Sequence, residues 1–308
     1  MQFKRVMSAA AVGILVAVSP LAVPLAAKVT QNEALATGKV TALKPISDWN
    51  LDYGAGRCRL ARLFGSNEDR HLLFFDQAAP DDSFGVTLAG SQASNFSRPG
   101  RTYVGFDPET ELRRLERLGS GDVPGYGPAI ILTAYTIAPS AAERASAPTP
   151  EHVSAGIDPR ALANSDRVTF MSGKRVLSLE TGNMMAPIEA LNACTDDLIN
   201  DWGLDPEKHR SYRPAKMRNL RAFTKSIQAN YPRKALVKGQ SGIVRMRVTV
   251  EADGSASDCA LEKTTKAESL NSPACKTAMR FAKFDPALDR DGQPMRSFYA
   301  TNITYSAQ

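Results

Sequence analysis

Hydrophobic and polar residues alternate most regularly in the last quarter of the chain. Residues 243–250 have the two-residue period of a half-buried strand, whose core face would carry Val244, Met246, Val248 and Val250. Asp253-Gly254 follows and predicts a type I′ hairpin turn, in which both central residues need positive φ. The return strand is expected from about Ser255 to Lys263.

A helix and a third strand are expected after this hairpin. Ser272 and Pro273 suit the N-cap and the first helical position, and the apolar residues that follow at helical spacing are Cys275, Ala278, Met279 and Ala282. Pro286 ends the helical pattern, because proline cannot continue the hydrogen-bond ladder. After a turn at Asp291-Gly292, the alternation returns from Met295 to Tyr305.

The order of these elements, preceded by a short helix at Tyr231-Pro232, resembles the carboxy-terminal domain of TonB, the periplasmic energy transducer of Gram-negative bacteria. The resemblance covers about residues 223–308 and rests on Tyr231-Pro232, Ala235, Gly242, Asp253-Gly254, Phe284, Pro286-Ala287, Asp291-Gly292 and Pro294. It implies a small αββαβ domain over residues 231–308 with a three-stranded antiparallel sheet. It also implies a domain that binds a protein partner and catalyses no reaction.

The last strand, Met295 to Tyr305, is expected to be an edge of that sheet, because it can join only outside the hairpin pair. An exposed edge can accept an extended peptide as an added strand. The resemblance implies that the partner is a segment of an outer-membrane receptor and assigns the contacts to Tyr299, Thr301, Asn302, Ile303 and Tyr305. Arg245 and Arg247, on the expected solvent face of the first strand, would add charge. The competing interpretation is that the preceding domain covers the edge.

The first 27 residues have the pattern of a targeting segment. Lys4 and Arg5 precede an apolar run from Val6 to Ala27, which Pro20 and Pro24 interrupt. This predicts a cleaved signal peptide and a periplasmic protein. The alternative is an uncleaved inner-membrane anchor with the chain facing the periplasm, because the run approaches the roughly 20 residues that cross a bilayer.

Residues 37–203 predict a β-rich α+β domain of unknown function. Strands are expected at 71–76, 84–88, 101–106, 129–137, 168–171 and 176–180, at the short spacing of an antiparallel unit. Residues 108–118 are charged and are predicted to be helical. The domain should end in an amphipathic helix that stops at Gly203, with an apolar face of Met184, Ile188, Leu191, Cys194, Leu198 and Trp202.

The four cysteines of the chain predict two disulfides in an exported protein. We expect Cys58 to pair with Cys194, and Cys259 with Cys275, because the second pair lies on strand and helix faces that meet. Zinc binding is a weaker alternative, since no Cys-x-x-Cys occurs and the three histidines lack ligand spacing.

Residues 208–250 contain twelve basic and no acidic residues, although the whole chain has a net charge of only +6. The remainder of the chain is therefore acidic. Within residues 204–230 a basic connecting helix is predicted to start at Pro214, with an apolar stripe of Met217, Leu220, Thr224 and Ile227. Such a helix could face an acidic protein surface, anionic lipid headgroups or nucleic acid, or be simply solvated. Nucleic acid is the poorest match for an exported chain.

No catalytic motif is visible, so no enzyme, metal or cofactor is expected. Asp81 and Asp82 are sequence neighbours and are expected to point apart, and His71 is expected to make a hydrogen bond at a strand edge. The sequence thus favours a non-catalytic periplasmic TonB-like protein, which would act in TonB-dependent transport across the outer membrane. Membrane contact is expected only through residues 1–27 or the basic connector. The alternatives are an exported structural or envelope protein that self-associates through the small domain, and an enzyme of unknown type in residues 37–203.

Overall fold

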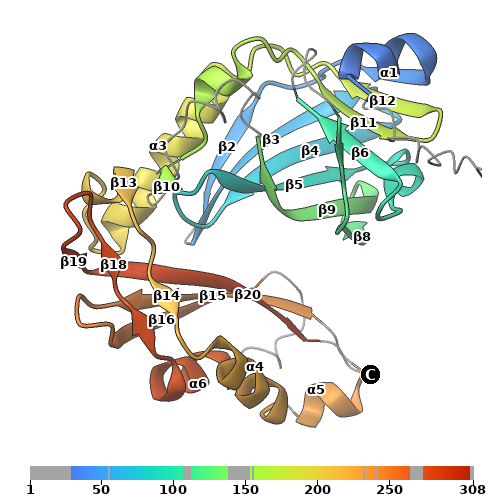
Figure 1. Ribbon diagram of the computed structural model, residues 1–308. Coiled ribbons are helices and arrows are strands. Elements are labelled where there is room, and N and C mark those ends of the chain that lie inside the picture. The colour runs from blue at the N-terminus through green and yellow to red at the C-terminus, as the bar shows by residue number, and fades with distance from the viewer. Residues whose placement is uncertain are drawn as a thin grey trace, which may run out of the picture.

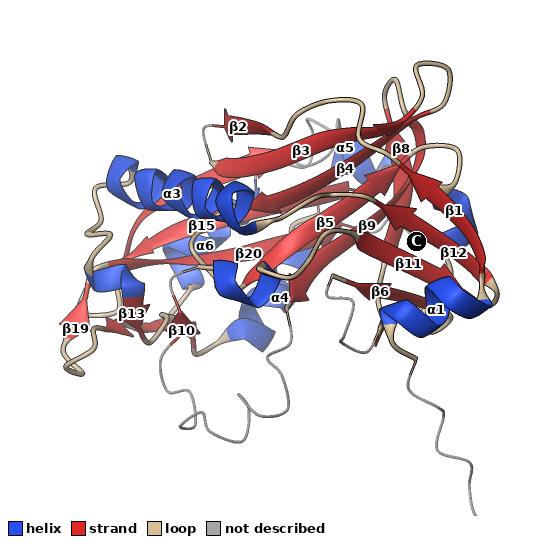
Figure 2. Cartoon of the chain, turned by 90° about the horizontal axis from the view of Figure 1, so that it is seen from above, coloured by secondary structure: helices blue, strands red, loops and turns tan. Residues whose placement is uncertain are grey.

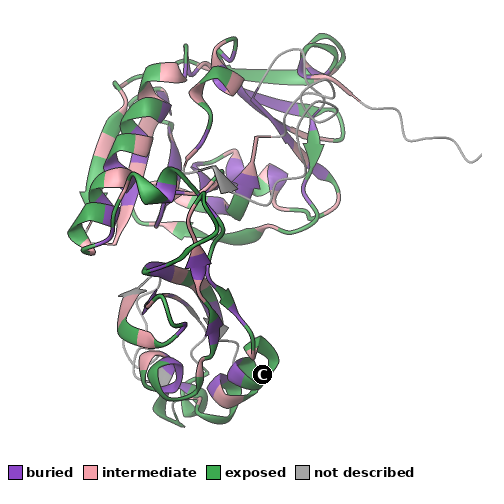
Figure 3. Cartoon of the chain, turned by 60° about the vertical axis from the view of Figure 1, so that its left-hand side comes forward, coloured by how far each residue is buried: buried purple, intermediate pink, exposed green. Residues whose placement is uncertain are grey.

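The computed structural model describes residues 29–54, 56–106, 112–137, 153–154, 156–231, 233–239, 242–263 and 273–305. The fold is α+β and mainly antiparallel, as predicted, and the chain forms a larger and a smaller lobe (Figures 1 and 3). The expected targeting segment, residues 1–27, lies outside the described residues, as does the expected N-cap Ser272.

The larger lobe contains two sheets. The six-stranded sheet is antiparallel, in the order β2 (Asn50–Gly54), β3 (Arg57–Gly65), β4 (Arg70–Gln77), β5 (Ser83–Ala89), β9 (Gly127–Thr136) and β8 (Gly119–Val123). The five-stranded sheet runs β1 (Lys39–Leu43), β12 (Arg175–Leu179), β11 (Val168–Ser172), β6 (Thr102–Gly105) and β7 (Arg113–Arg114). In this sheet β1 and β12 are parallel and the other pairs are antiparallel.

The core of the larger lobe lies between the two sheets and α3 (Met185–Asp201) (Figure 2). Aromatic side chains fill much of it, and Phe75 packs edge-on against Phe84 with ring centroids 5.5 Å apart. The lobe begins with α1 (Gln31–Thr37), which starts with a capping box between Thr30 and Glu33. The 3₁₀ turns η1 (Ala93–Phe96) and η2 (Pro159–Leu162) complete it. The helix predicted over 108–118 is wrong for the residues described there, because Arg113 and Arg114 pair with β6.

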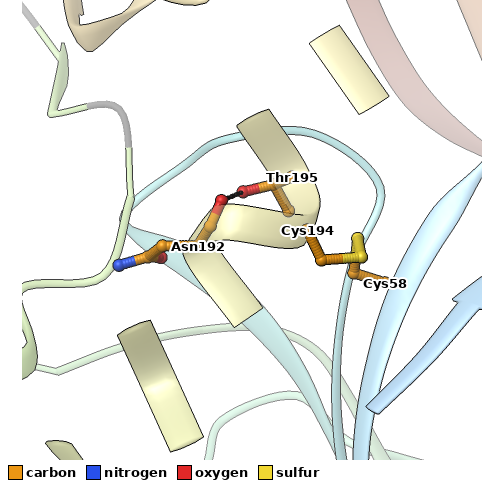
Figure 4. Close-up of a disulfide and its surroundings, with 4 residues drawn as sticks. All are labelled: Cys58, Asn192, Cys194 and Thr195. Atoms are coloured by element: carbon orange, nitrogen blue, oxygen red, sulfur yellow. Dashed lines mark hydrogen bonds between the residues drawn. A yellow bond between two sulfur atoms is a disulfide. The ribbon is translucent and has the colours of Figure 1, made fainter. Parts of the chain in front are cut away.

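A disulfide fixes α3 to the six-stranded sheet (Figure 4). Cys194 on the buried face of α3 is bonded to Cys58 of β3, 136 residues earlier in the chain. Two residues earlier in α3, Asn192 holds the loop before η2 by a pair of hydrogen bonds to the backbone of Ile157. Covalent and polar links therefore support the amphipathic helix that the sequence predicted.

The smaller lobe is built on a three-stranded antiparallel sheet with the order β16 (Ala256–Lys263), β15 (Gly242–Val250) and β20 (Ser297–Tyr305). The helices α4 (Leu220–Ala229), α5 (Arg233–Val237) and α6 (Pro273–Phe281) lie on the side of this sheet away from the larger lobe (Figure 1). The predicted face of β15 is buried against them, with Val244, Met246, Val248 and Val250 at most 2% exposed. Cys259 of β16 is bonded to Cys275 of α6.

Short strand pairs join the lobes and close the smaller one. They are β10 (Val153–Ser154) with β13 (Ser211–Tyr212), β14 (Lys216–Met217) with β17 (Phe284–Asp285), and β18 (Ala287–Leu288) with β19 (Pro294–Met295), and the turn η3 (Lys208–Arg210) precedes β13. The helix predicted to start at Pro214 is therefore wrong at its beginning, since Lys216 and Met217 are extended and α4 starts at Leu220. Tyr212, Phe223 and Ile227 belong to the core of the smaller lobe, so this segment is more than a connector.

The hairpin between β15 and β16 is present, but its turn differs from the predicted type I′. Among the described residues only glycines have positive φ, so Asp253 does not adopt the required conformation, whereas Gly254 has a φ of 84°. Gly254 donates to the carbonyl of Glu251, and the N–H of Glu251 donates to Ser255. These bonds define a type I turn followed by a glycine bulge, the common three-residue hairpin loop.

Candidate functional site

β20 is an edge strand, as predicted. Among the described residues it has one ladder, to β15, with a register that runs from Gly242 opposite Tyr305 to Val250 opposite Ser297. Its other side faces the larger lobe across a groove. This edge is the candidate site.

The hydrogen bonds of the hairpin between β15 and β16 indicate which backbone groups of β20 point away from β15. Glu251 makes its two backbone hydrogen bonds toward β16, and successive residues of a strand direct their N–H and C=O groups to opposite sides. Even-numbered residues of β15 therefore bond to β20, and their register partners are the odd-numbered residues of β20. The backbone groups that point outward from β20 belong to Phe298, Ala300, Asn302 and Thr304.

The groove beside β20 has a volume of about 710 Å³. One wall is β20 from Phe298 to Asn302, and the other is the end of β4, the loop at 78–82 and the start of β5. Tyr212, Pro214 and Ala215 also line the groove. The larger lobe therefore lies beside the edge of the sheet but leaves space along it.

Gln77 supports the loop that forms the far wall. It is 3% exposed, and its Nε2 donates to the carbonyls of Asp81, at 2.7 Å, and Ser83, at 3.0 Å. Its Oε1 has no hydrogen-bond partner among the described residues. The amide of Gln77 therefore fixes the loop from beneath, with its oxygen buried.

Asp81 and Asp82 lie on this wall as an interacting pair, so the expectation that they point apart is wrong. The backbone N–H of Ser83 donates to Asp81 Oδ1 at 3.1 Å, which turns the loop back on itself. Burial of its carboxylate, together with a hydrogen bond and repulsion from Asp81, raises the pKa of Asp82 to about 6. Burial raises the pKa of the Tyr212 hydroxyl, and the charge of Asp81 raises it further.

Arg245 and Arg247 do not face solvent, which corrects the prediction from the alternation. Arg245 Nη2 lies 3.2 Å from Asp76 Oδ2, with only 16% and 12% of the two side chains exposed, and its Nε donates to Asn302 Oδ1 at 3.3 Å. The guanidinium of Arg247 lies over the ring of Trp202, 4.1 Å from the centroid. Their face of the sheet is covered by the larger lobe, so both arginines connect the lobes.

The five predicted contact residues of β20 occupy three kinds of position. Tyr299, Thr301 and Asn302 line the groove. Ile303 is 8% exposed and belongs to the core of the smaller lobe. Tyr305 lies at the end of the ladder, opposite Gly242.

A second set of contacts joins the lobes at one end of the groove. Phe298 packs edge-on against Trp202 at 5.4 Å and nearly parallel to His209 at 5.9 Å. The His209 ring donates from Nδ1 to the carbonyl of Asp205 at 2.7 Å, so Nε2 accepts the hydroxyl of Ser297 at 2.9 Å. Burial lowers the pKa of His209, which keeps this imidazole neutral.

Several groove residues were not identified from the sequence, namely Asp76, Gln77, Asp81, Tyr212, Phe298 and Ala300. Most of them come from the larger lobe or from the segment before α4, and they meet β20 only through the folding of distant segments. The polar Asp76-Gln77 at the end of an apolar strand is the one local sign of a polar site at this strand end.

The described residues contain no cluster of three or more potential metal ligands. His71 is buried, and its Nε2 accepts from the backbone N–H of Gln92 and lies 3.4 Å from Ser91 Oγ. Ser91, however, donates to Asp69, so the carboxylate binds the serine and does not orient the imidazole. This arrangement lacks the serine–histidine–aspartate order of a nucleophilic triad.

Comparison with known families agrees with the resemblance stated above. Residues 227–307 match the family model described as Gram-negative bacterial TonB protein C-terminal. The matched segment contains the last residues of α4, the helices α5 and α6, and all of the three-stranded sheet. No curated protein sequence matches the chain. Among the residues that the structure describes, no helix has the length and apolar character needed to cross a membrane.

Proposed function

We propose that this protein is a non-catalytic, periplasmic TonB-like adaptor that binds an extended segment of a protein partner as an added strand on β20. The observation that carries the proposal is the outward-pointing backbone of β20 along an open groove. Main-chain hydrogen bonds would provide affinity, and side-chain contacts in the groove would provide specificity. The family match supports a partner of the kind that TonB proteins bind, an outer-membrane receptor segment, and thus a role in transport across that membrane.

The groove favours a partner segment with a basic side chain. Arg245 neutralises Asp76, but Asp81 and Asp82 have no ion pair with a basic residue among the described residues. A lysine or arginine opposite them would pair with the two carboxylates and lower the pKa of Asp82. The acidic loop would thereby reject acidic segments, which is specificity by repulsion.

Ala300→Pro tests the strand addition. Proline removes the N–H of residue 300, which points into the groove, and leaves the ladder to β15 intact because edge strands tolerate proline on their open side. Fluorescein-labelled peptides from receptor amino-terminal segments should bind the wild-type chain in fluorescence anisotropy. We expect the variant to bind at least about tenfold more weakly, because a hydrogen bond is lost and the ring obstructs the groove.

Thr301→Pro is the matched control, because its N–H points inward to β15. It should lower the thermal midpoint by several degrees, whereas Ala300→Pro should change it little. Equal peptide affinity for wild type and a folded Ala300→Pro variant would exclude addition at β20. Self-association through the same edge would instead give a concentration-dependent dimer in sedimentation, lost in Ala300→Pro.

A further inference from the structure

The helical face of the smaller lobe exposes an unusual amount of apolar surface. Eight large hydrophobic side chains are strongly exposed among the described residues, and five of them belong to α4, α5 and α6. These five are Leu220 (49%), Leu236 (48%), Val237 (88%), Met279 (43%) and Phe281 (45%). Single exposed apolar residues are ordinary, but such a concentration indicates an interaction surface.

The same three helices carry only positive charge. Residues 218–231, 233–239 and 273–283 contain no acidic residue, and their basic residues are all exposed: Arg218, Arg221, Lys225, Arg233, Lys234, Lys238, Lys276, Arg280 and Lys283. Arg218 lies 3.6 Å from Asp285 and is the one member of the set with an ion pair among the described residues. The remaining eight cations have no ion pair with a carboxylate in the part of the chain that the structure describes.

The three helices form one outward layer. They lie on the side of the sheet away from the larger lobe (Figure 1), and much of their surface is exposed (Figure 3). A shallow cavity of about 410 Å³ lies between α4 and α6, where Ala222, Phe281 and Ala282 alternate with Ser226, Arg280 and Lys283. Apolar and basic groups are therefore interleaved.

We propose that this helical face, α4, α5 and α6, docks on the surface of an anionic phospholipid bilayer. The apolar side chains would enter the boundary between headgroups and acyl chains, and the surrounding lysines and arginines would bind lipid phosphates, as in interfacial amphipathic helices. Nucleic acid explains the charge but not the exposed aliphatic side chains. An acidic protein surface explains both less well, because exposed cations spread over three helices need a broad anionic plane.

Docking in this way leaves the strand-binding groove free. The groove and the helical layer lie on different sides of the smaller lobe, so a membrane below the helices would not obstruct β20 (Figure 1). Membrane docking and partner binding are therefore independent, and each can fail without the other.

Val237→Trp provides a local readout, since the natural tryptophans, Trp49 and Trp202, lie outside the helical face. The full chain is mixed with vesicles of brominated phosphatidylglycerol or of brominated phosphatidylcholine, and tryptophan emission is recorded. We expect a blue shift and bromine quenching with the anionic vesicles alone. Residues 1–27 are present in every sample. Attachment of the chain through them is therefore common to both kinds of vesicle and cannot by itself produce the signal at position 237.

Charge variants in the Val237→Trp background complete the test. Replacing Arg233, Lys234 and Lys238 together by glutamine should weaken vesicle binding about 100-fold, at about fivefold per basic residue. The matched control replaces Lys39, Lys174 and Arg175, an exposed basic group of the larger lobe, and should bind like the parent. No blue shift on anionic vesicles, or equal binding by parent and triple variant, would overturn the proposal. Binding to an acidic protein in competition with the vesicles, without quenching, would assign the face to that partner instead.

Discussion

Several charged side chains lie at the contact between the lobes, where burial strengthens their electrostatic interactions. Asp76 and Arg245 form the least exposed ion pair among the described residues. Breaking such a pair leaves one buried charge without compensation, so the pair holds the two lobes in a definite relation. A few residues away, partial burial and the neighbouring Asp81 together raise the pKa of Asp82.

His209 should make stability fall in mild acid. Its pKa is lowered in the folded protein, mainly by burial, from an ordinary value of about 6.5. Above that pH the imidazole is neutral in both states and its contribution is complete. As the pH falls below it, the unfolded chain binds a proton that the folded chain does not, so the free energy of unfolding decreases. Urea unfolding between pH 5 and pH 8 measures this decrease, and His209→Gln should reduce it.

Asp82 has the opposite effect on the free energy of unfolding in the same pH range. Its folded pKa of about 6 lies above the ordinary aspartate value, so the folded protein gains a proton first and is stabilised as the pH falls. The His209 comparison is therefore best made in an Asp82→Asn background. If His209→Gln in that background leaves the change of unfolding free energy with pH unaltered, the assignment of a neutral buried imidazole is contradicted.

For single residues, the sequence predicted on which face of an element a side chain lies but not what that side chain contacts. The alternation correctly placed Arg245 and Arg247 opposite the valine face of their strand. It predicted that both would face solvent, because the two-residue period of a strand does not indicate whether another lobe packs on the polar face. Asp81 and Asp82 were expected to point apart, as they would in regular structure, yet the Asp81 side chain binds the backbone of Ser83 and folds the loop.

Among the elements, the two disulfides connect a helix to a strand in each lobe. The Cys259–Cys275 bond closes 16 residues and the Cys58–Cys194 bond closes 136. Loop-closure entropy of the unfolded chain then gives about 3 kcal/mol for the first and about 5 kcal/mol for the second. We expect the Cys259→Ala/Cys275→Ala pair to lose less stability than Cys58→Ala/Cys194→Ala.

Denaturant unfolding of the two double variants, with the wild type in oxidised and reduced form, measures these losses. Reduction of the wild type should remove about the sum of both, because the bonds lie in different lobes and share no partners. A larger loss from the short loop than from the long one would show that strain or residual structure outweighs chain entropy.

Local signals predicted most elements of the smaller lobe. The glycine after Asp253, the proline at the start of α6 and the valine alternation of β15 each act within a few residues. The sequence does not predict that Lys216 and Met217 are extended, because their partner, β17, lies about 70 residues later. Pairing at that distance overrides the local preference of Pro214 for a helix start, and no pattern in the segment reveals it.

In the whole molecule, the arrangement of the lobes creates the groove, and the sequence did not predict it. Residues from β4, β5, β13 and β20 meet there although they are separated by more than 200 positions. The expected division at 37–203, 204–230 and 231–308 stays a prediction. Within it, Leu204 packs with Phe298 and Ile227 lies in the smaller core, so residues 204–230 contact both lobes.

Trp202→Ala should uncouple the lobes. The side chain packs on Phe298 and under the guanidinium of Arg247, so its loss leaves a cavity at the joint and removes a cation–π contact. Differential scanning calorimetry should show one transition for the wild type and two for the variant, with the smaller lobe unfolding first. A single transition shifted by only a degree would mean that the remaining contacts, Arg245 to Asp76 among them, suffice.

The bond between Cys58 and Cys194 has a mechanical consequence. A strand held on β20 and pulled along its length would load the β15–β20 ladder in shear, and the tension would pass through Phe298 to Trp202 at the end of α3. A helix lying on a sheet by apolar contact alone could be peeled away turn by turn. Here the covalent bond in mid-helix would stop the peeling and pass the load to β3, which is paired on both sides within the six-stranded sheet.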